Sequence, residues 1–312
     1  MPCQRSQPVV PEPQGIYIEP TNICTLKCSG CARTTFINQW PQAWRNHSID
    51  IQDLMRFLDL DLTDKTVLLS GNYGDPIYHP EFVTLVQQLK SHGARLKITT
   101  NGSYRNQEWW SQLAMCFDPA DMIVFSIDGL PSNFMQYRQN ADWPSMLQGI
   151  QACVASTAHV AWKYIPFDFN QDNIDQARTV SEDLGFDSFY LDPSKRFDDC
   201  ATQALQPRAD LISPEYHDRV IWKNQTSGAV LPRCATGQEH FITADGYYTP
   251  CCYVADHRWL YKTDFGRQRS RYAIADHTLS EILAQDQVRQ FYQQLDQHAV
   301  CQFSCPKSQN TI

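Results

Sequence analysis

The amino-acid sequence predicts an α/β protein, in which a partial (β/α)6 barrel is followed by a small cysteine-rich domain. Two observations indicate this fold class. Short β-rich runs alternate with helical patterns through the first two thirds of the 312 residues, and such alternation produces parallel βα units. After about Pro193 the alternation stops, and the remaining segment combines closely spaced cysteines with too few apolar residues for a good core of its own.

Six strands are expected in the barrel. They correspond to residues 15–20, 66–71, 94–100, 122–128, 159–165 and 187–192. Because a closed barrel of this type needs about eight βα units, six units predict a partial barrel or an open sheet. In parallel arrangements the functional loops follow the carboxyl ends of the strands, so the residues just after each run are candidates for a site.

Helical patterns occupy the gaps between these runs. They cover residues 49–60, 80–92, 106–116, 143–155 and 173–185. Pro80 suits a first helical position, while Gly93 and Gly185 stand where a helix should end. The aromatic-rich segment 34–48 is expected to be a surface loop that packs its tryptophans on the barrel.

The chain divides into four expected parts. They are an N-terminal extension (residues 1–14), the barrel core (15–195), a linker (196–215) and the cysteine-rich domain (216–312). Within the last part, an Asp-Gly turn in ADGYY predicts a short hairpin, and residues 279–295 predict one helix. Metal ligation would compensate for the small core of this domain.

The charge and composition exclude several classes of protein. Lys and Arg number 26 while Asp and Glu number 34, and the resulting formal charge of −8 argues against a general nucleic-acid binder. No signal peptide and no bilayer-spanning apolar run is visible, so a cytoplasmic protein without a membrane partner is expected. Because that compartment keeps thiols reduced, 12 cysteines indicate metal binding or catalysis before disulfides.

Three cysteines stand close together directly after the first expected strand. Cys24, Cys28 and Cys31 have the spacing C-x3-C-x2-C, so their thiolates can ligate three irons of a [4Fe–4S] cube and leave the fourth iron open. An open metal position suits catalysis. Zinc fits poorly because only three unevenly spaced ligands are present. The alternative of three buried apolar cysteines needs a coincidence of spacing and position.

This motif, placed after the first strand of a partial barrel, resembles the radical S-adenosylmethionine (SAM) superfamily. The resemblance implies that the open iron chelates SAM, and that reductive cleavage gives methionine and a 5′-deoxyadenosyl radical. That radical would abstract a hydrogen atom from a substrate, while the protein positions the cofactor. An external one-electron reductant of the flavodoxin or ferredoxin type is also implied.

Further landmarks of the superfamily follow the next strands in chain order. The sequence YGDP at residues 73–76 resembles a Gly-Gly-Glu-Pro motif, and TTNGS after the third run resembles a recurrent Thr-Asn-Gly motif. Glycine there permits close backbone approach, and the acid can accept a hydrogen bond from the methionine ammonium. The resemblance implies cofactor binding by Gly74, Asp75, Thr100, Asn101, Ser126, Asp128 and Asn170.

The sequence departs from the superfamily pattern at three positions. Gly30 precedes the third cysteine, where an aromatic residue near the adenine is usual, and Tyr73 replaces the first glycine of the glycine-rich motif. Asp75 replaces the glutamate of that motif. Aspartate is shorter by one methylene, so its carboxylate reaches less far toward the ammonium.

A second group of cysteines lies near the C-terminus. Cys234, Gly246 and Cys251 resemble the opening of the SPASM extension of radical SAM enzymes, which reads C-x(9–15)-G-x4-C, and the later cysteines are too few for its two clusters. The segment therefore resembles the shortened form called the twitch domain, with one auxiliary [4Fe–4S] cluster. Its implied ligands are Cys234, Cys251, Cys301 and Cys305.

Two alternatives remain open for this second site. The same four thiolates could hold a structural zinc ion. Cys252 could replace Cys251, because adjacent residues on a strand point to opposite faces, although the G-x4-C spacing favours Cys251. Five cysteines have no assigned role, namely Cys3, Cys116, Cys153, Cys200 and Cys252. Of these, Cys116 and Cys153 are expected in the core, and Cys200 is a hypothetical hydrogen-atom donor.

The resemblance implies two classes of function, and a third hypothesis stands outside it. The first is modification of a ribosomally made peptide or protein by cross-linking, epimerisation, oxidation or backbone excision. With about fourteen residues before the first strand, no separate leader-binding domain is expected, so a leader-binding partner protein could be required. The second class is a dehydrogenase or mutase acting on a small molecule, and the third is a non-catalytic zinc or iron–sulfur module. Lys163, Tyr164 and Lys195 are candidate substrate contacts.

Overall fold

A computed structural model describes residues 10–197, 200–214 and 230–305. Within these residues, eight strands form one sheet in the order β6-β5-β4-β3-β2-β1-β7-β8. The first six strands are parallel and match the predicted runs, which confirms the partial α/β barrel. They are β1 (Gly15–Ile18), β2 (Thr66–Leu69), β3 (Arg95–Thr100), β4 (Met122–Ser126), β5 (His159–Tyr164) and β6 (Ser188–Leu191).

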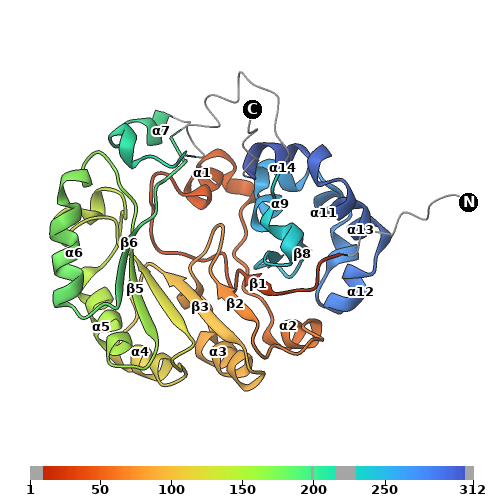
Figure 1. Cartoon of the computed structure of the whole chain (residues 1–312), viewed down its shortest axis with the longest axis horizontal. Coiled ribbons are helices and arrows are strands. Elements are labelled where there is room, and N and C mark those ends of the chain that lie inside the picture. The colour runs from red at the N-terminus through yellow and green to blue at the C-terminus, as the bar shows by residue number, and fades with distance from the viewer. Residues whose placement is uncertain (1–9, 198–199, 215–229, 306–312) are drawn as a thin grey trace, which may run out of the picture.

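The five predicted barrel helices are present. They are α2 (Ile51–Phe57), α3 (Phe82–Ser91), α4 (Gln107–Ala114), α5 (Trp143–Val154) and α6 (Ile174–Asp183), and they lie along the outer side of the strands (Figure 1). Gly93 and Gly185 follow α3 and α6 with φ of 82° and 84°, so the predicted glycine stops are confirmed. Pro80 is not in the first helical position, because α3 begins two residues later. No helix in the described ranges is long and apolar enough to cross a membrane.

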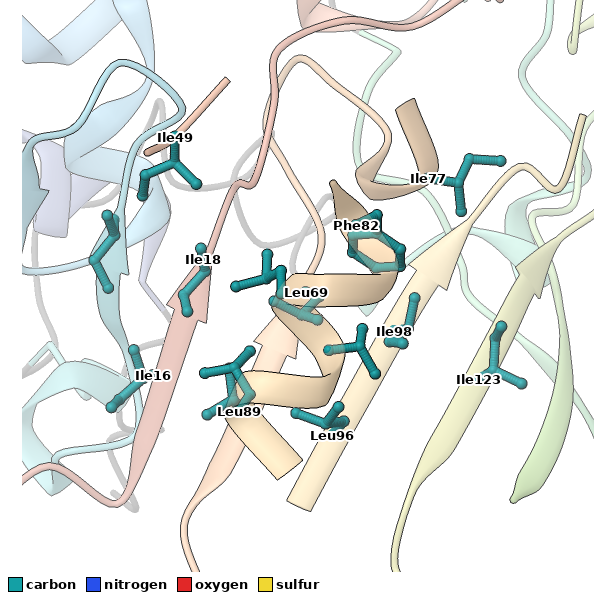
Figure 2. Close-up of a cluster of buried hydrophobic side chains, with 14 of the residues drawn as sticks. Ile16, Ile18, Ile49, Leu69, Ile77, Phe82, Leu89, Leu96, Ile98 and Ile123 are labelled. Carbon is teal, nitrogen blue, oxygen red and sulfur yellow. The ribbon is translucent and has the colours of Figure 1, made fainter. Parts of the chain in front are cut away.

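The core lies between the sheet and its outer helices. Parallel strands that are covered on both faces have nearly continuous apolar sequences, and such sequences predict these strands. Figure 2 shows the part of this core around α3, where each labelled side chain is at most 3% exposed. The labelled residues are Ile16, Ile18, Ile49, Leu69, Ile77, Phe82, Leu89, Leu96, Ile98 and Ile123.

The expected surface loop at residues 34–48 is largely helical. It contains α1 (Ala32–Gln39) and the 3-10 turn η1 (Pro41–Ala43). No residue of α1 is buried, so the helix carries no apolar stripe from which periodicity could have predicted it. The expected packing of tryptophans holds for Trp44, whose ring centroid lies 5.9 Å from that of Tyr73, whereas Trp40 is 48% exposed.

The predicted hairpin is confirmed, and it also extends the barrel sheet. Strand β7 (His240–Ile242) pairs antiparallel with β8 (Tyr248–Thr249), and Gly246 adopts a φ of 80° in the turn. On its other side β7 runs parallel to β1, with Ile16 opposite His240 and Ile18 opposite Ile242. The cysteine-rich segment is thus joined by backbone hydrogen bonds to the strand that precedes the first cysteine group.

The predicted helix over residues 279–295 is wrong as a single element. It is divided into α12 (Leu279–Leu283) and α13 (Asp286–Gln293), because Gln285 has an extended backbone and caps the second helix. Each short helix buries its own apolar residues, so the two can pack in different directions. Within the described ranges, the other α-helices are α7 (Cys200–Gln203), α9 (Cys252–Ala255), α10 (His257–Leu260), α11 (Asp264–Arg267) and α14 (Ala299–Ser304).

Candidate functional site

A cavity of about 300 Å³ lies at the carboxyl ends of the barrel strands. Its wall is formed by the cysteine loop after β1, the loop after β2, the ends of β3, β4 and β5, and the segment after β6. The structure brings eight of the predicted cluster and cofactor residues into this wall: Cys24, Cys28, Cys31, Gly74, Asp75, Thr100, Asn101 and Ser126. The site therefore forms where the parallel topology predicts it.

The cysteine loop is held by contacts outside the cavity. Thr25 Oγ1 lies 2.7 Å from the hydroxyl of Tyr78, and the side-chain amide of Asn140 donates to the Thr25 carbonyl at 2.9 Å. Burial raises the pKa of Cys24 to about 12 and that of Cys28 to about 11. Cys28 is buried and Cys24 and Cys31 are half-buried, and three thiols gathered in one wall are suited to a cationic metal group that stabilises their thiolate forms.

Asp75 is the centre of a buried hydrogen-bond network. Its Oδ1 accepts hydrogen bonds from the Thr100 hydroxyl at 2.7 Å and from the Ile77 N–H at 3.3 Å. Its Oδ2 accepts hydrogen bonds from the Asn101 backbone N–H at 2.6 Å and from the Asn101 side-chain amide at 2.5 Å. Four donors occupy the lone pairs of the carboxylate. Asp75 thus fixes the ends of β2 and β3 relative to each other, and little acceptor capacity is left for a methionine ammonium.

The loop before Asp75 rests on a second buried carboxylate, which sequence reasoning missed. Glu19 Oε1 accepts hydrogen bonds from the backbone N–H groups of Tyr73 at 2.7 Å and Gly74 at 3.1 Å. Burial raises the pKa of Glu19 to about 7. Gly74 is required at its position because a Cβ there would overlap the Thr21 carbonyl. The available signal was a charged residue that directly follows an apolar strand, in the sequence IYIEP.

Two predicted cofactor residues lie behind the cavity wall. Asp128 Oδ2 is 2.6 Å from Arg138 Nε, and Asp128 Oδ1 accepts a hydrogen bond from the Ile165 N–H at 2.8 Å. Asn170 is fully buried, and its side-chain amide donates to the carbonyls of Asp128 at 3.1 Å and Ile165 at 3.0 Å. Among the cavity-lining residues, the structure places Arg138 where Asp128 was expected. Sequence reasoning also missed Arg138, which has no motif of its own.

The four predicted ligands of the second site come together from three segments of the chain. Cys234, Cys251 and Cys301 are buried, and Cys305 is half-buried. The Cys305 backbone N–H donates a hydrogen bond to the Cys301 carbonyl at 3.0 Å, and the two thiols lie close enough to shift each other's pKa in opposite directions. Burial, with a smaller contribution from the nearby Cys305, raises the pKa of Cys234 to about 12. None of the cysteines described by the structure forms a disulfide.

Cys251 and Cys252 face different surroundings. Burial raises the pKa of Cys251, and Cys252 and Cys234 raise it further. The Cys252 thiol lies near Glu239 and Lys195, which influence its pKa and also that of Cys305, and the Cys252 carbonyl accepts a hydrogen bond from the Asn72 side chain at 2.8 Å. Cys305, Cys251 and Cys234 all contribute to raising the pKa of Cys301, which groups Cys251 with the other three predicted ligands.

The remaining predicted residues have mixed positions. Cys153 is fully buried in the core, as expected, whereas Cys116 is only partly buried and packs against the core. Cys3 and the Cys200 side chain lie outside the described part of the chain. Lys163 and Lys195 line the cavity. Tyr164 does not, because its buried hydroxyl donates to the Asn170 carbonyl at 2.8 Å.

Among the described residues, no group of three or more His, Cys, Asp or Glu side chains is already arranged to hold a metal ion.

Comparison with models of protein families decides to which superfamily the chain belongs. The model of the radical SAM superfamily matches residues 18–177, which include the cysteine loop and the ends of β2 to β5. The chain belongs to the radical SAM superfamily. A second model, that of the SPASM iron–sulfur cluster-binding domain, matches residues 234–306, which contain the second cysteine group. This radical SAM enzyme therefore combines the barrel with a SPASM region, as the sequence predicted.

One curated relative is 30% identical over 121 residues. It is the tungsten-containing aldehyde ferredoxin oxidoreductase cofactor-modifying protein of Pyrococcus furiosus. The match covers 38% of this chain and 31% of the relative, so the radical SAM enzyme spans about a third of the relative's length.

Solved structures resemble the radical SAM enzyme over most of its length. Streptococcus suis SuiB bound to SAM has a TM-score of 0.58 at 14% identity, covering 95% of this chain and 79% of SuiB. The enzyme anSMEcpe with bound SAM has a TM-score of 0.59 at 13% identity, covering 89% of this chain and 83% of anSMEcpe. BtrN in complex with SAM and 2-DOIA has a TM-score of 0.50 at 14% identity, covering 95% of this chain and 93% of BtrN. At these identities the likeness shows the fold.

Proposed function

We propose that this radical SAM enzyme modifies a ribosomally made peptide or protein by hydrogen-atom abstraction. The supporting observation is the likeness of both parts of the chain to peptide-bound structures. SuiB bound to the precursor peptide SuiA has a TM-score of 0.61, covering 93% of this chain and 68% of SuiB. The structure of anSMEcpe with SAM and the Cp18Cys peptide has a TM-score of 0.59, covering 89% of this chain and 82% of anSMEcpe.

In this proposal the cavity at the barrel mouth is the reaction chamber. Cys24, Cys28 and Cys31 hold the [4Fe–4S] cluster, and the cluster with bound SAM supplies a 5′-deoxyadenosyl radical. The protein contributes position and rigidity, because abstraction of a hydrogen atom depends on close approach of the reacting atoms. Asp75 fixes the loop that faces the cofactor, and Gly74 lets the backbone of that loop approach closely.

We further propose that Cys234, Cys251, Cys301 and Cys305 ligate one auxiliary [4Fe–4S] cluster. The support is their convergence and the different surroundings of Cys252. Four thiolates fill the ligand positions of one cube, so this cluster would transfer electrons or stabilise the fold. The domain boundaries predicted from the sequence, with a linker at residues 196–215, remain part of the proposal, as does an external flavodoxin or ferredoxin.

A small-molecule substrate is the second candidate. The observation that favours it is the nearly complete structural match with BtrN. The match covers 95% of this chain and 93% of the BtrN chain. BtrN was crystallised with the small molecule 2-DOIA. A dehydrogenase or mutase acting on such a compound would use the same cavity and the same cysteines.

The experiment that separates these candidates is co-expression with a short peptide encoded by a neighbouring gene. The proposal predicts a mass change in that peptide that depends on Cys24 and on SAM. The change should be absent with a Cys24→Ala enzyme. Two results together would favour the second candidate. The peptide would stay unmodified, and a small molecule made by the products of neighbouring genes would stimulate 5′-deoxyadenosine formation. Addition of a separately encoded leader-binding protein tests whether a partner is needed.

A further inference from the structure

Two side chains of the loop after β2 reach across to the cysteine-rich segment. The side-chain amide of Asn72 donates a hydrogen bond to the Cys252 carbonyl at 2.8 Å, although the two residues are 180 positions apart. The Tyr73 hydroxyl accepts a hydrogen bond from the His257 backbone N–H at 2.7 Å and lies 3.1 Å from His257 Nδ1. We call Asn72 and Tyr73 the bridge. It connects the barrel to residues that closely follow Cys251, a proposed ligand of the second site.

On the barrel side, the bridge belongs to the loop that faces the first cysteine group. Asn72 and Tyr73 both line the cavity, as does Asp75. The Tyr73 N–H donates a hydrogen bond to Glu19 Oε1 at 2.7 Å, and the Asp75 N–H donates one to the carbonyl of Ile23, the residue before the first cysteine, at 3.0 Å. A loop held this closely cannot absorb a displacement of Tyr73. Such a displacement would therefore move the groups that face the cofactor.

On the other side, the bridge contacts two helices of four residues each. The Cys252 carbonyl belongs to α9, which packs against β7, β8 and α14, and His257 is the first residue of α10. Helices of a single turn have little stability of their own, so their positions depend on the groups that hold them. Cys251 is the N-cap residue of α9, and Cys301 lies in α14. A metal group bound by Cys251 and Cys301 would therefore fix α9 from two directions.

Aromatic packing adds a second connection between the same parts of the chain. The His257 ring centroid lies 5.1 Å from that of Phe36 and 6.1 Å from that of Tyr73. Phe36 belongs to α1, which begins directly after Cys31, and in Figure 1 α1 lies beside the helices of the cysteine-rich segment. A movement of α10 would thus reach both the loop after β2 and the helix that follows the first cysteine group.

We propose that Asn72 and Tyr73 are positioning residues that couple the two metal sites. A metal group bound at the second cysteine group holds the loop after β2, through the bridge, in the conformation that binds SAM. This inference rests on the proposed function, which assigns SAM to the cavity. It applies to an iron–sulfur cluster or to a zinc ion at the second site, because either would fix the same cysteines. By thermodynamic linkage, bound SAM strengthens metal binding at the second site by the same factor.

A double-mutant cycle of SAM dissociation constants tests this coupling. Anaerobic equilibrium dialysis measures SAM binding, without turnover, to protein whose first cluster is loaded. Cys301→Ala, which empties the second site, should weaken SAM binding at least about fivefold. The Asn72→Ala, Tyr73→Phe double variant, called the bridge variant, should keep the metal of both sites and weaken SAM binding to a similar extent. The triple variant should bind SAM no more weakly than either parent, because the coupling is already lost in each.

Two comparisons separate positioning from a general loss of stability. Thr157→Val is the matched control, because it removes the 3.1 Å hydrogen bond from the Thr157 hydroxyl to the Phe117 carbonyl at the amino end of β5, and it should leave SAM affinity unchanged. At saturating SAM, the change that SAM causes in the electron paramagnetic resonance spectrum of the reduced first cluster should be smaller in the bridge variant than in this control. If Cys301→Ala does not fold, Cys305→Ala removes a half-buried ligand of the same site instead.

Three results would overturn the inference. They are unchanged SAM affinity in Cys301→Ala, unchanged SAM affinity in the bridge variant, and losses of affinity that add in the triple variant. Additive losses would mean that Asn72 and Tyr73 affect SAM independently of the second site. SAM cleavage by the unmodified enzyme is measured separately. An enzyme that cleaves SAM but shows no coupling would keep the proposed function and refute only this inference.

Discussion

Glu19 offers a quantitative test of how the loop at residues 73–75 is supported. Its side chain is 2% exposed, and burial raises its pKa from 4.5 to about 7. The raised pKa means that the folded protein binds a proton that the unfolded chain releases above about pH 4.5. The ionised carboxylate therefore costs stability, and the cost grows as the pH rises from about 4.5 to about 7 and is constant above that. From the two pKa values the full cost is about 3 kcal/mol.

The Glu19→Gln variant removes this titration. An amide oxygen can still accept the hydrogen bonds that Glu19 Oε1 receives from Tyr73 and Gly74. We expect the variant to be more stable than the unmodified protein by up to about 3 kcal/mol at pH 8, with a difference close to zero near pH 5.

Urea unfolding under anaerobic conditions measures this difference across pH 5–8. Comparing the two proteins at each pH cancels the titration of the groups that they share. The reasoning would be refuted by a stability difference that does not change with pH, or by one that favours the unmodified protein more strongly at pH 8 than at pH 5. Glu19→Ala serves as the contrast, since it removes the acceptor as well as the charge and should be less stable than Glu19→Gln at every pH.

Three further predictions concern the loop after β2 and the second cysteine group. Gly74→Ala should weaken SAM binding more than tenfold by equilibrium dialysis, because the added Cβ overlaps a backbone carbonyl of the loop after β1; unchanged affinity would contradict the assigned close approach. Tyr73→Phe should lower the free energy of unfolding by about 1–3 kcal/mol, because the phenol oxygen accepts a hydrogen bond from the His257 N–H at 2.7 Å; an unaffected urea midpoint would show that this contact contributes little. Cys251→Ser should lose about four irons per chain while Cys252→Ser keeps them; the reverse pattern of iron content would exchange the two assignments.

The elements that could be predicted from the sequence are those whose signals are local. The six barrel strands are apolar runs bounded by turn residues, and the cysteine spacings C-x3-C-x2-C and G-x4-C lie within short stretches. Gly93 and Gly185 mark helix ends because they adopt positive φ, a property of the residue type itself. These features are the ones that the structure and the family comparisons bear out.

The features that escaped prediction depend on contacts between distant segments. The pairing of β7 with β1 joins residues more than two hundred positions apart, and no local pattern specifies it. The helix α1 has no buried face, and the break between α12 and α13 contains neither glycine nor proline. Glu19 and Arg138 act through partners in other loops, so their roles became visible only with the hydrogen bonds and ion pairs of the folded chain.

The central claim is that the two cysteine groups hold two separate clusters, the first of which cleaves SAM. Anaerobic reconstitution with iron quantitation and 5′-deoxyadenosine measurement tests it most directly. We expect about eight irons per chain and reductant-dependent 5′-deoxyadenosine formation, since each of two cubes holds four irons. Cys24→Ala should keep about four irons and form no 5′-deoxyadenosine, whereas Cys301→Ala should lose the other four. A protein that binds zinc without iron, or a Cys24→Ala variant with full iron and full SAM cleavage, would contradict the claim.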